Sequence, residues 1–321
     1  MGEVSMHDDS LLYQVAESYF VQGMTTNAVG ERLGVSRSTI SRMLTEAKAR
    51  GIVTITLRQP DKPSDRISRR FEDLFGVRSH IAGTTRGARS AQRLDAVSRY
   101  AADLLGRWVD DGTVIGVAWG TTTSTVASYL KQSTTSDVTV VQLNGAAGPR
   151  STGIGTSTPV LATMAKAFNA QLYPFPAPAF FDQEEARALL WQESSVRRIL
   201  AVRAATQIAV FSVGAFHGPV VSQVYSEGHL SPATLRSLNE NRVVGDMCTV
   251  FIREDGSYAD IELNRRASGP TPSELARIPR RLCIVSGRHK IPGILGALRS
   301  GAVTDLVIDD LTAREVLDRA G

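Results

Sequence analysis

The chain has little of several residue patterns that mark particular protein classes. Its 321 residues contain two cysteines, Cys248 and Cys283, which excludes a disulfide framework and the spacing of a zinc finger. No apolar run approaches the roughly 18 residues of a membrane span, and residues 1–10 are too polar and acidic for a signal or transit peptide. Its five histidines show no metal-ligand spacing and no convincing nucleophile partner. We therefore expect a cytoplasmic protein with no membrane partner, metal, cofactor or catalytic triad.

The composition is that of a globular protein with about two domains. Apolar residues make up 42% of the chain and charged residues 21%, which is sufficient to bury a core. The net charge of +4 is a weak indication of nucleic acid, because residues 1–60 contain six basic and six acidic side chains. An interpretation as a DNA-binding protein must therefore rest on where the charges lie.

The N-terminal residues have the pattern of a helix-turn-helix. Apolar periodicity predicts helices over 9–22 and 26–33, a turn at Gly34, and a third helix that begins after Ser36 and ends near Arg50. Gly30 interrupts the second helix at a small cost in stability. The third helix has an apolar stripe and a polar face, and residues 31–50 carry a local charge of +3. A small helical bundle with a solvated face is the alternative. The candidate DNA-binding residues are Thr26, Ser36, Arg37, Ser38, Thr39, Ser41 and Arg42.

The residues after this motif suggest a domain boundary. Residues 52–57 alternate like a strand, which predicts the wing of a winged helix-turn-helix. Pro60 and Pro63 lie in a polar stretch that is typical of a linker. We therefore expect a DNA-binding domain over 1–59, a linker over 60–65 and a second domain over 66–321.

The second domain has the pattern of an α/β fold. Short apolar runs at 114–119, 138–143, 208–213, 282–285 and 306–308 alternate with helical patterns. This alternation predicts a mostly parallel sheet with helices on both faces. Asp255 and Gly256 predict a hairpin turn. Ligands of such sheets bind beyond the carboxyl ends of the strands.

Two strand ends have the composition of anion-binding loops. The first has glycine and hydroxyl side chains before a helix, and the second adds basic side chains: Trp119, Gly120, Thr121, Thr122 and Thr123, then Ser286, Gly287, Arg288 and Lys290. Helix N-termini attract anions, so the pair indicates a phosphorylated small molecule. Each loop taken alone is equally compatible with a plain turn.

Three aspartates are candidates for ligand chemistry or for turns and helix caps. Asp246 follows an apolar strand and is either an acceptor for ligand hydroxyls or a turn residue. Asp309 and Asp310 precede a helical pattern, which favours capping over catalysis.

The order and spacing of these motifs resemble the SorC/DeoR-type sugar-binding bacterial transcriptional regulators. The motifs lie at 33–44, 116–122, 140–145, 244–248, 286–290 and 309–313. The resemblance implies a Rossmann-like effector domain shaped like sugar-phosphate isomerases, which binds a sugar phosphate and adjusts affinity for double-stranded operator DNA. It also implies a homodimer or homotetramer.

The resemblance assigns roles to individual residues. Trp119 to Thr122 would hold the phosphate, Asn144 and Gly145 would lie beneath the sugar, Asp246 would accept its hydroxyls, and Lys290 would meet its charged end. Members that resemble the deoxyribonucleoside regulator have a lysine where this chain has Asn144, and they bond covalently to an aldehyde sugar. We therefore expect non-covalent effector binding here.

Two other functions fit parts of the pattern. A sugar-phosphate isomerase fits the expected fold, but the chain lacks a clear acid–base pair, and fold does not define function. A DNA-binding protein whose second domain only oligomerises is the other alternative. Turnover of sugar phosphates would favour the first, and a lack of ligand-induced thermal stabilisation would favour the second.

Overall fold

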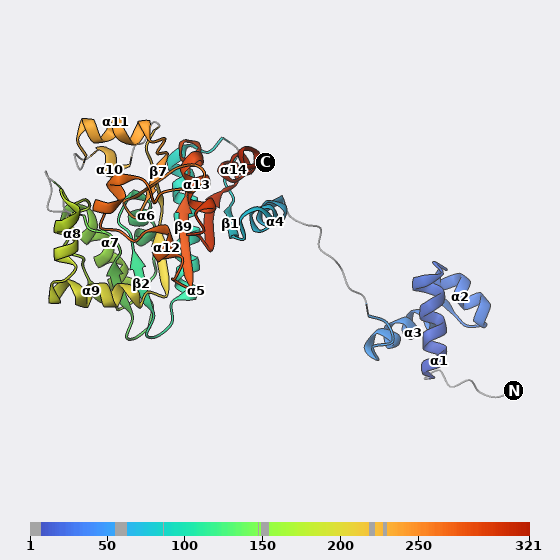
Figure 1. Cartoon of the computed structure of the whole chain (residues 1–321). Helices are drawn as coiled ribbons and strands as arrows, with labels where there is room; N and C mark the ends of the chain where they lie inside the picture. The colour runs from blue at the N-terminus through green and yellow to red at the C-terminus, as the bar shows by residue number, and fades with distance from the viewer. Residues whose placement is uncertain are drawn as a thin grey trace. The chain divides into compact units, whose positions relative to one another are not determined.

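The computed structural model describes residues 8–54, 63–85, 87–146, 148, 154–217, 222–226 and 230–321. The chain divides into two compact units, residues 1–60 and residues 61–321 (Figure 1). Each unit is described by itself.

The N-terminal unit contains the three predicted helices. Helix α1 (Asp9–Ala16) continues as a π-helical turn, η1 (Glu17–Val21), and is followed by α2 (Thr26–Leu33) and α3 (Arg37–Ala49). Ser36 caps α3 by accepting a hydrogen bond from the N–H of Thr39 (3.2 Å). Gly34 ends α2 with φ of 70°, which a glycine adopts without strain.

One small core holds these helices together. It is formed by Leu12, Val15, Ala16, Val29, Ile40, Met43, Leu44 and Ala47. Gly30 lies at the closest approach of α2 to the following turn, because a Cβ there would be 2.7 Å from the carbonyl oxygen of Val35. The turn itself is closed by a hydrogen bond from Val35 N–H to the Gly30 carbonyl (2.9 Å). The close packing of α2 against the turn therefore requires a residue without a Cβ at position 30.

The predicted wing and linker are only partly within the described residues. Residues 52–54 are not in a strand, and 55–57 lie outside the described part. The linker expected over 60–65 ends earlier than predicted, since α4 (Pro63–Phe75) already contains residues 63–65. Its Ile67 and Phe71 are buried in the core of the second unit, which explains why the helix extends toward the boundary.

A parallel sheet forms the centre of the C-terminal unit. Within the described residues, its strands lie in the order β1-β10-β9-β5-β2-β3-β4, and all neighbours are parallel. They are β1 (Arg78–Ala82), β2 (Val114–Val117), β3 (Thr139–Gln142), β4 (Gln171–Tyr173), β5 (Ile208–Phe211), β9 (Arg280–Val285) and β10 (Asp305–Asp309). All strands except β1 follow the order 3-2-1-4-5-6 of a doubly wound sheet. The direction of winding reverses between β2 and β5.

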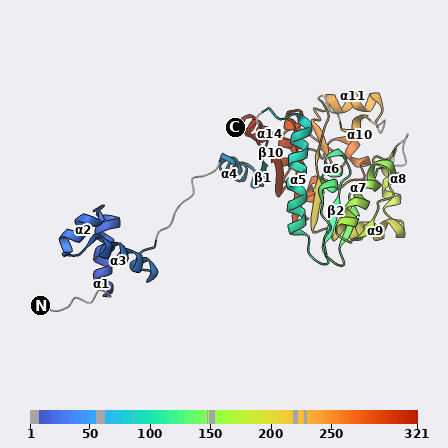
Figure 2. The ribbon, with the colours of Figure 1, turned by 180° about the vertical axis from the view of Figure 1, so that it is seen from behind.

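Helices cover both faces of this sheet. Helices α5 (Ser90–Trp108), α6 (Thr121–Tyr129) and α7 (Ile154–Ala167) contribute to the core of one face (Figure 2). Helices α4, α13 (Ile291–Arg299) and α14 (Asp310–Ala320) contribute to the core of the other. In β9, Leu282 and Ile284 face the first layer, whereas Cys283 and Val285 face the second, as the two-residue period of a strand requires.

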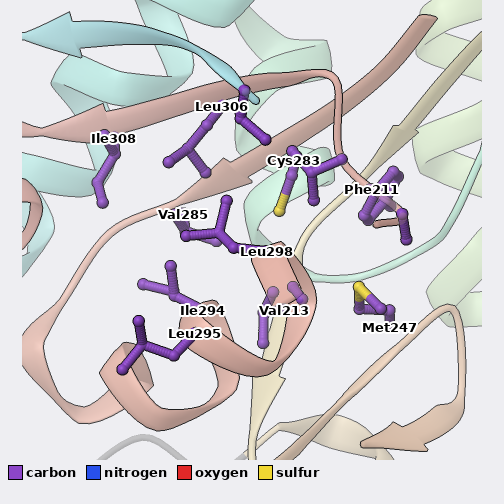
Figure 3. Close-up of a cluster of buried hydrophobic side chains, with 14 of the residues drawn as sticks. Phe211, Val213, Met247, Cys283, Val285, Ile294, Leu295, Leu298, Leu306 and Ile308 are labelled. Carbon is purple, nitrogen blue, oxygen red and sulfur yellow. The ribbon is translucent and has the colours of Figure 1, made fainter. Parts of the chain in front are cut away.

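Figure 3 shows the second layer, where α13 packs its apolar side chains against the sheet. Ile294, Leu295 and Leu298 of this helix are buried beside Val285, Leu306 and Ile308 of the strands. Burying an aliphatic side chain of this size contributes about 1.5–3 kcal/mol. This packing fixes the start of α13, and with it the loop that connects β9 to α13.

A smaller antiparallel sheet lies beside the carboxyl end of β5. It contains β6 (Val213–Ala215), β7 (Gly245–Met247) and β8 (Val250–Ile252). Its hairpin turn is formed by Cys248 and Thr249, with φ of 50° and 68°. The prediction of a hairpin at Asp255 and Gly256 is wrong. These residues form a turn after β8, and no strand follows directly with which β8 could form a hairpin.

The remaining helical segments are mostly short. They are α8 (Glu184–Leu190), α9 (Ser194–Ala204), α10 (Gln223–Ser226), α11 (Pro232–Glu240), α12 (Pro272–Leu275) and the short 3-10 segments η2 (Glu262–Arg266) and η3 (Arg288–Lys290). Leu275 of α12 joins the core of the second face.

Candidate functional site

A cleft opens at the carboxyl ends of four neighbouring strands, β9, β5, β2 and β3, where the winding of the sheet reverses. Doubly wound sheets bind ligands at this position. The small sheet closes one side of the cleft through β6 and β7. The lining residues are Ala118, Trp119, Gly120, Thr121, Thr122, Asn144, Ser212, Val213, Gly214, Ala215, Ser222, Gln223, Val224, Asp246, Cys248, Thr249 and Lys290.

The N-terminus of α6 faces this cleft. Gly120 precedes the helix with φ of 151°, so the chain turns there from β2 into the helix. The first N–H groups of a helix have no partner within it and carry partial positive charge. The hydroxyl of Thr122 lies 3.3 Å from that of Ser212. Thr123 does not line the cleft, since it is buried and donates its hydroxyl to the Gly120 carbonyl (3.0 Å).

The end of β3 forms the floor of the cleft and is held from behind. Gly145 accepts a hydrogen bond from the indole of Trp119 (2.9 Å) and donates its N–H to the hydroxyl of Ser268 (2.9 Å). Gly145 supports the floor and does not itself line the cleft. Asn144 is 1% exposed, and its side-chain oxygen has no hydrogen-bond partner among the described residues. A buried acceptor of this kind is costly unless a ligand satisfies it.

A second buried acceptor lies on the opposite wall. Asp246 accepts the N–H of Thr249 at Oδ2 (3.2 Å), while its Oδ1 has no partner among the described residues. The wall is tight, because a Cβ on Gly214 would lie 2.0 Å from this oxygen. Burial raises the pKa of Asp246 to about 6. The N–H of Thr249, the hydroxyl of Tyr225 and the charge of Lys290 favour the carboxylate and act to lower this pKa.

Lys290 supplies positive charge to the cleft. Its Nζ lies 3.5 Å from the hydroxyl of Ser212. Burial lowers the pKa of Lys290, and the nearby Cys283 and Asp246 act in the opposite direction. An ammonium group, free helix N–H groups and hydroxyls thus surround one part of the cleft, which suits an anion.

Three predicted residues of the β9 loop lie outside the cleft. Arg288 points away from it and pairs with Glu315 of α14 (Nε to Oε2, 2.7 Å). Ser286 and Gly287 shape the loop without lining the cleft. Arg288 therefore does not belong to the binding surface, because its long side chain reaches a carboxylate on the exterior.

The sequence missed several lining residues. Ser212 interrupts the apolar run 208–213, where the chain leaves β5 and enters β6 of the other sheet. Cys248 and Thr249 form the hairpin turn with left-handed backbone and no glycine to signal it. Ser222 and Gln223 follow no recognisable strand end. Only Ser212 carried a signal, as a polar residue within an apolar run.

The N-terminal unit presents the predicted polar face on α3. Arg37, Ser38, Ser41 and Arg42 are exposed on this helix. The other candidates are less available: Ser36 and Thr39 bond to each other in the cap (Oγ to Oγ1, 2.8 Å), and Thr26 is half-buried.

The described residues hold no group of three or more His, Cys, Asp or Glu side chains that could bind a metal ion. No helix among them is long and apolar enough to cross a membrane.

Known proteins resemble the chain over most of its length. Residues 62–318 match the family model "Putative sugar-binding domain". The deoxyribonucleoside regulator of Bacillus subtilis (strain 168) is 27% identical over 310 residues, which cover 96% of this chain and 97% of that protein. The sorbitol operon regulator of Klebsiella pneumoniae is 24% identical over 97% of both chains.

Solved structures that share this fold are also described as regulators. A domain of "a possible sugar-binding transcriptional regulator" from Arthrobacter aurescens TC1 is 38% identical, has a TM-score of 0.74, and covers 81% of this chain and 100% of its own. The full-length regulator SorC from Klebsiella pneumoniae shares the fold, with a TM-score of 0.71 at 24% identity over 97% of this chain and 99% of its own. The chain belongs to this family of sugar-binding domains, and its resemblance to SorC/DeoR-type regulators is confirmed.

Proposed function

We propose that this protein is a transcriptional regulator that binds operator DNA through its N-terminal unit and a phosphorylated sugar or polyol in the cleft of its C-terminal unit. The observation that carries the proposal is the pairing of two kinds of group in one cleft. The N-terminus of α6 and Lys290 suit an anion, while Asn144 and Asp246 each present a buried Oδ1 that has no partner among the described residues.

This pairing selects a class of ligand. A phosphate accepts hydrogen bonds from the N–H groups and hydroxyls near Thr122, and its charge pairs with Lys290. Hydroxyl groups of the same ligand donate to Asn144 Oδ1 and Asp246 Oδ1. A plain anion leaves these acceptors unsatisfied, and an unphosphorylated sugar leaves the positive region without a partner.

The relatives support a regulatory role and not an enzymatic one. Their names include a deoxyribonucleoside regulator, a sorbitol operon regulator and an erythritol catabolism regulatory protein from Brucella abortus. The strand order supports the expected Rossmann-like sheet. We infer that the ligand is a carbohydrate or polyol derivative and that the regulated genes serve its transport or catabolism.

The DNA-binding part of the proposal rests on α2, the turn and α3. We infer that α3 is the recognition helix, whose start enters the major groove and presents Arg37, Ser38, Ser41 and Arg42. Two such units acting together would read two half-sites about one helical turn apart, so we propose a homodimer or homotetramer. Light scattering of the full chain measures the oligomeric state.

Ligand binding is tested with matched pairs of phosphorylated and free sugars, such as glucose 6-phosphate with glucose and ribose 5-phosphate with ribose. Calorimetry on the full chain should find tighter binding of the phosphorylated member. Thr122→Val should weaken it about tenfold, since one charge-assisted hydrogen bond contributes about 1.5–3 kcal/mol. Thr125→Val is the control, because the Thr125 hydroxyl donates to the Thr121 carbonyl (2.9 Å) on the exposed side of α6. Equal affinity for both members of every pair would contradict the phosphate site.

DNA binding is tested by gel shift with the upstream region of the neighbouring genes. Arg42→Ala should weaken binding by about 1–3 kcal/mol if Arg42 contacts a base, or lower the salt slope by about one unit if it contacts phosphate. Arg277→Ala removes an exposed positive charge from the C-terminal unit and serves as the control. Unchanged affinity after substitution of both Arg37 and Arg42 would remove α3 from the interface. Adding the ligand should change the affinity of the unmodified chain in either direction.

A further inference from the structure

The carboxylate of Asp309 is fully buried behind the loop that carries Lys290. Its Oδ1 accepts hydrogen bonds from Arg93 Nη1 of α5 (3.0 Å) and from the N–H of Thr312 (3.1 Å). Its Oδ2 accepts the hydroxyl proton of Thr312 (2.6 Å). Asp309 thus caps α14, and the charge of Arg93 balances its own.

The hydroxyl of Thr312 connects this cap to the cleft. A hydroxyl has one proton to donate, and Thr312 gives it to Asp309, so toward any other group it is an acceptor. The group that it accepts from is the N–H of Gly287 (3.2 Å), in the loop between β9 and Lys290. Gly287 has φ of 103°, a conformation that side chains disfavour, so this loop turns where the hydrogen bond holds it.

We propose that Arg93, Asp309 and Thr312 position the loop 287–290 so that Lys290 meets the anion of the ligand. The inference rests on the proposed function, because it takes Lys290 as the partner of that anion. Thr312 and Asp309 are positioning residues: neither lines the cleft, and both act through the Gly287 backbone.

Capping alone does not require the third hydrogen bond. The N–H of Thr312 and the carboxylate of Asp309 complete the cap, and a hydroxyl is not needed for it. The same helix holds the loop at a second point, since Glu315 pairs with Arg288 (2.7 Å). Within the described part of the chain, the Lys290 ammonium group makes one long hydrogen bond, from Nζ to Ser212 Oγ (3.5 Å). The position of its ammonium group therefore depends on the backbone that α14 holds.

Hydrogen exchange of the ligand-free full chain tests the proposal directly. Thr312→Val keeps the shape of the side chain but removes the acceptor, so the amide of Gly287 should exchange roughly twofold to tenfold faster. Thr312→Ser keeps a hydroxyl and should restore the slow rate. Thr304→Val is the matched control, since the Thr304 hydroxyl also accepts an N–H of β9, that of Arg281 (2.7 Å), at the opposite end of the strand.

Binding of inorganic phosphate, measured by calorimetry, supplies the functional readout. Thr312→Val should weaken it by a similar factor, while Thr312→Ser and Thr304→Val should leave it near that of the unmodified chain. Unchanged exchange at Gly287 in Thr312→Val, or equal loss of phosphate binding in Thr312→Val and Thr304→Val, would overturn the proposal. If the unmodified chain binds no phosphate, the proposed phosphate site is wrong, and the exchange of Gly287 still decides whether Thr312 positions the loop.

Discussion

Replacing Asp246 by Asn should stabilise the C-terminal unit at neutral pH and weaken its binding of sugars. Asn keeps an oxygen that can accept the N–H of Thr249, and it removes the carboxylate charge from a wall that is 5% exposed. Burial raises the pKa of Asp246 from 3.8 to about 6 in the folded chain. A difference of about two pKa units corresponds to about 3 kcal/mol between the two protonation states.

The sign of this effect follows from proton linkage. Between about pH 4 and pH 6 the folded chain holds more of this proton than the unfolded chain does, so Asp246 makes the protein less stable as pH rises through that window. Well above pH 6 the buried carboxylate lowers the free energy of unfolding by the full amount. The Asn variant lacks the titration, so its advantage should be about 3 kcal/mol at pH 8 and roughly half of that at pH 5.

Tryptophan fluorescence during urea unfolding measures this advantage. The three tryptophans, Trp108, Trp119 and Trp191, all lie in the C-terminal unit, so the signal reports on that unit alone. Subtracting the curves of the unmodified chain cancels the titration of other groups. A variant that is less stable at pH 8, or whose advantage does not change with pH, would show that the carboxylate is already compensated and would refute the reasoning.

Asp305 gives a control of opposite sign. It is also buried, and burial acts to raise its pKa, but the hydrogen bond with His80 (3.3 Å) and the charge of Arg78 lower it overall. A carboxylate with a lowered pKa stabilises the fold above its unfolded value and loses that contribution as pH falls. Asp305→Asn should therefore destabilise the chain at pH 8, and the difference should shrink toward acidic pH.

Three further outcomes follow from the structure. Gly30→Ala should lower the stability of the N-terminal unit by about 1–3 kcal/mol, because the new Cβ would lie 2.7 Å from the Val35 carbonyl oxygen; circular dichroism during thermal unfolding measures it, and a neutral result would contradict this packing. Gly145→Ala should destabilise the C-terminal unit by a similar amount, about 1–3 kcal/mol, since its Cβ would meet the Ala177 carbonyl oxygen at 2.3 Å; urea unfolding followed by tryptophan fluorescence tests it. Borohydride reduction with sugar phosphates should leave the intact mass unchanged, whereas an adduct at Lys290 would show covalent binding.

Helix α2, the turn at Gly34 and the start of α3 could be predicted closely, because these boundaries depend on local chemistry. Gly34 adopts φ of 70° at the end of α2, and Ser36 accepts the N–H of Thr39 at the start of α3. Such caps act within a few residues of the chain, so the sequence alone determines them. The strands β2, β3, β5, β9 and β10 were predicted for a related reason, since each is a buried apolar run.

The elements that sequence reasoning missed are stabilised by distant neighbours. Strand β1 contains Arg78, Ser79 and His80 and, among the described strands, lies at the sheet edge beside β10, so its pattern is not that of a buried strand. The small sheet turns at Cys248 and Thr249, whose left-handed backbone is imposed by surrounding packing: a Cβ on Gly269 would lie 1.7 Å from the Cys248 carbonyl oxygen. Tertiary contacts of this kind leave no local signal.

In the candidate site, too, some residues could be predicted from local sequence and others depend on tertiary contacts. The strand ends identified Trp119 to Thr122, Asp246 and Lys290, and the family resemblance added Asn144. The fold brings all of these residues to one cleft. Arg288 was misplaced, because residues that are adjacent in a loop can face opposite directions, and its guanidinium reaches Glu315 instead. Ser212 was missed because one apolar run supplies strands to two sheets.

Asn144 on the floor of the cleft and Asp246 on its wall each have an acceptor oxygen without a partner among the described residues, and packing and stability alone do not explain this. A turn at the end of β3 does not require a buried amide oxygen without a partner, and a carboxylate whose pKa is raised to about 6 costs folding free energy at neutral pH. Groups held at such a cost are typical of binding sites, where the ligand supplies the missing partners. The ligand then binds only the folded unit and stabilises it. Under the proposed function, those partners are hydroxyl groups of the sugar, which donate to Asn144 and Asp246, while its phosphate binds at the start of α6. The buried oxygens of Asn144 and Asp246 would therefore explain both the folding free energy that the cleft costs and the stabilisation expected when the ligand binds.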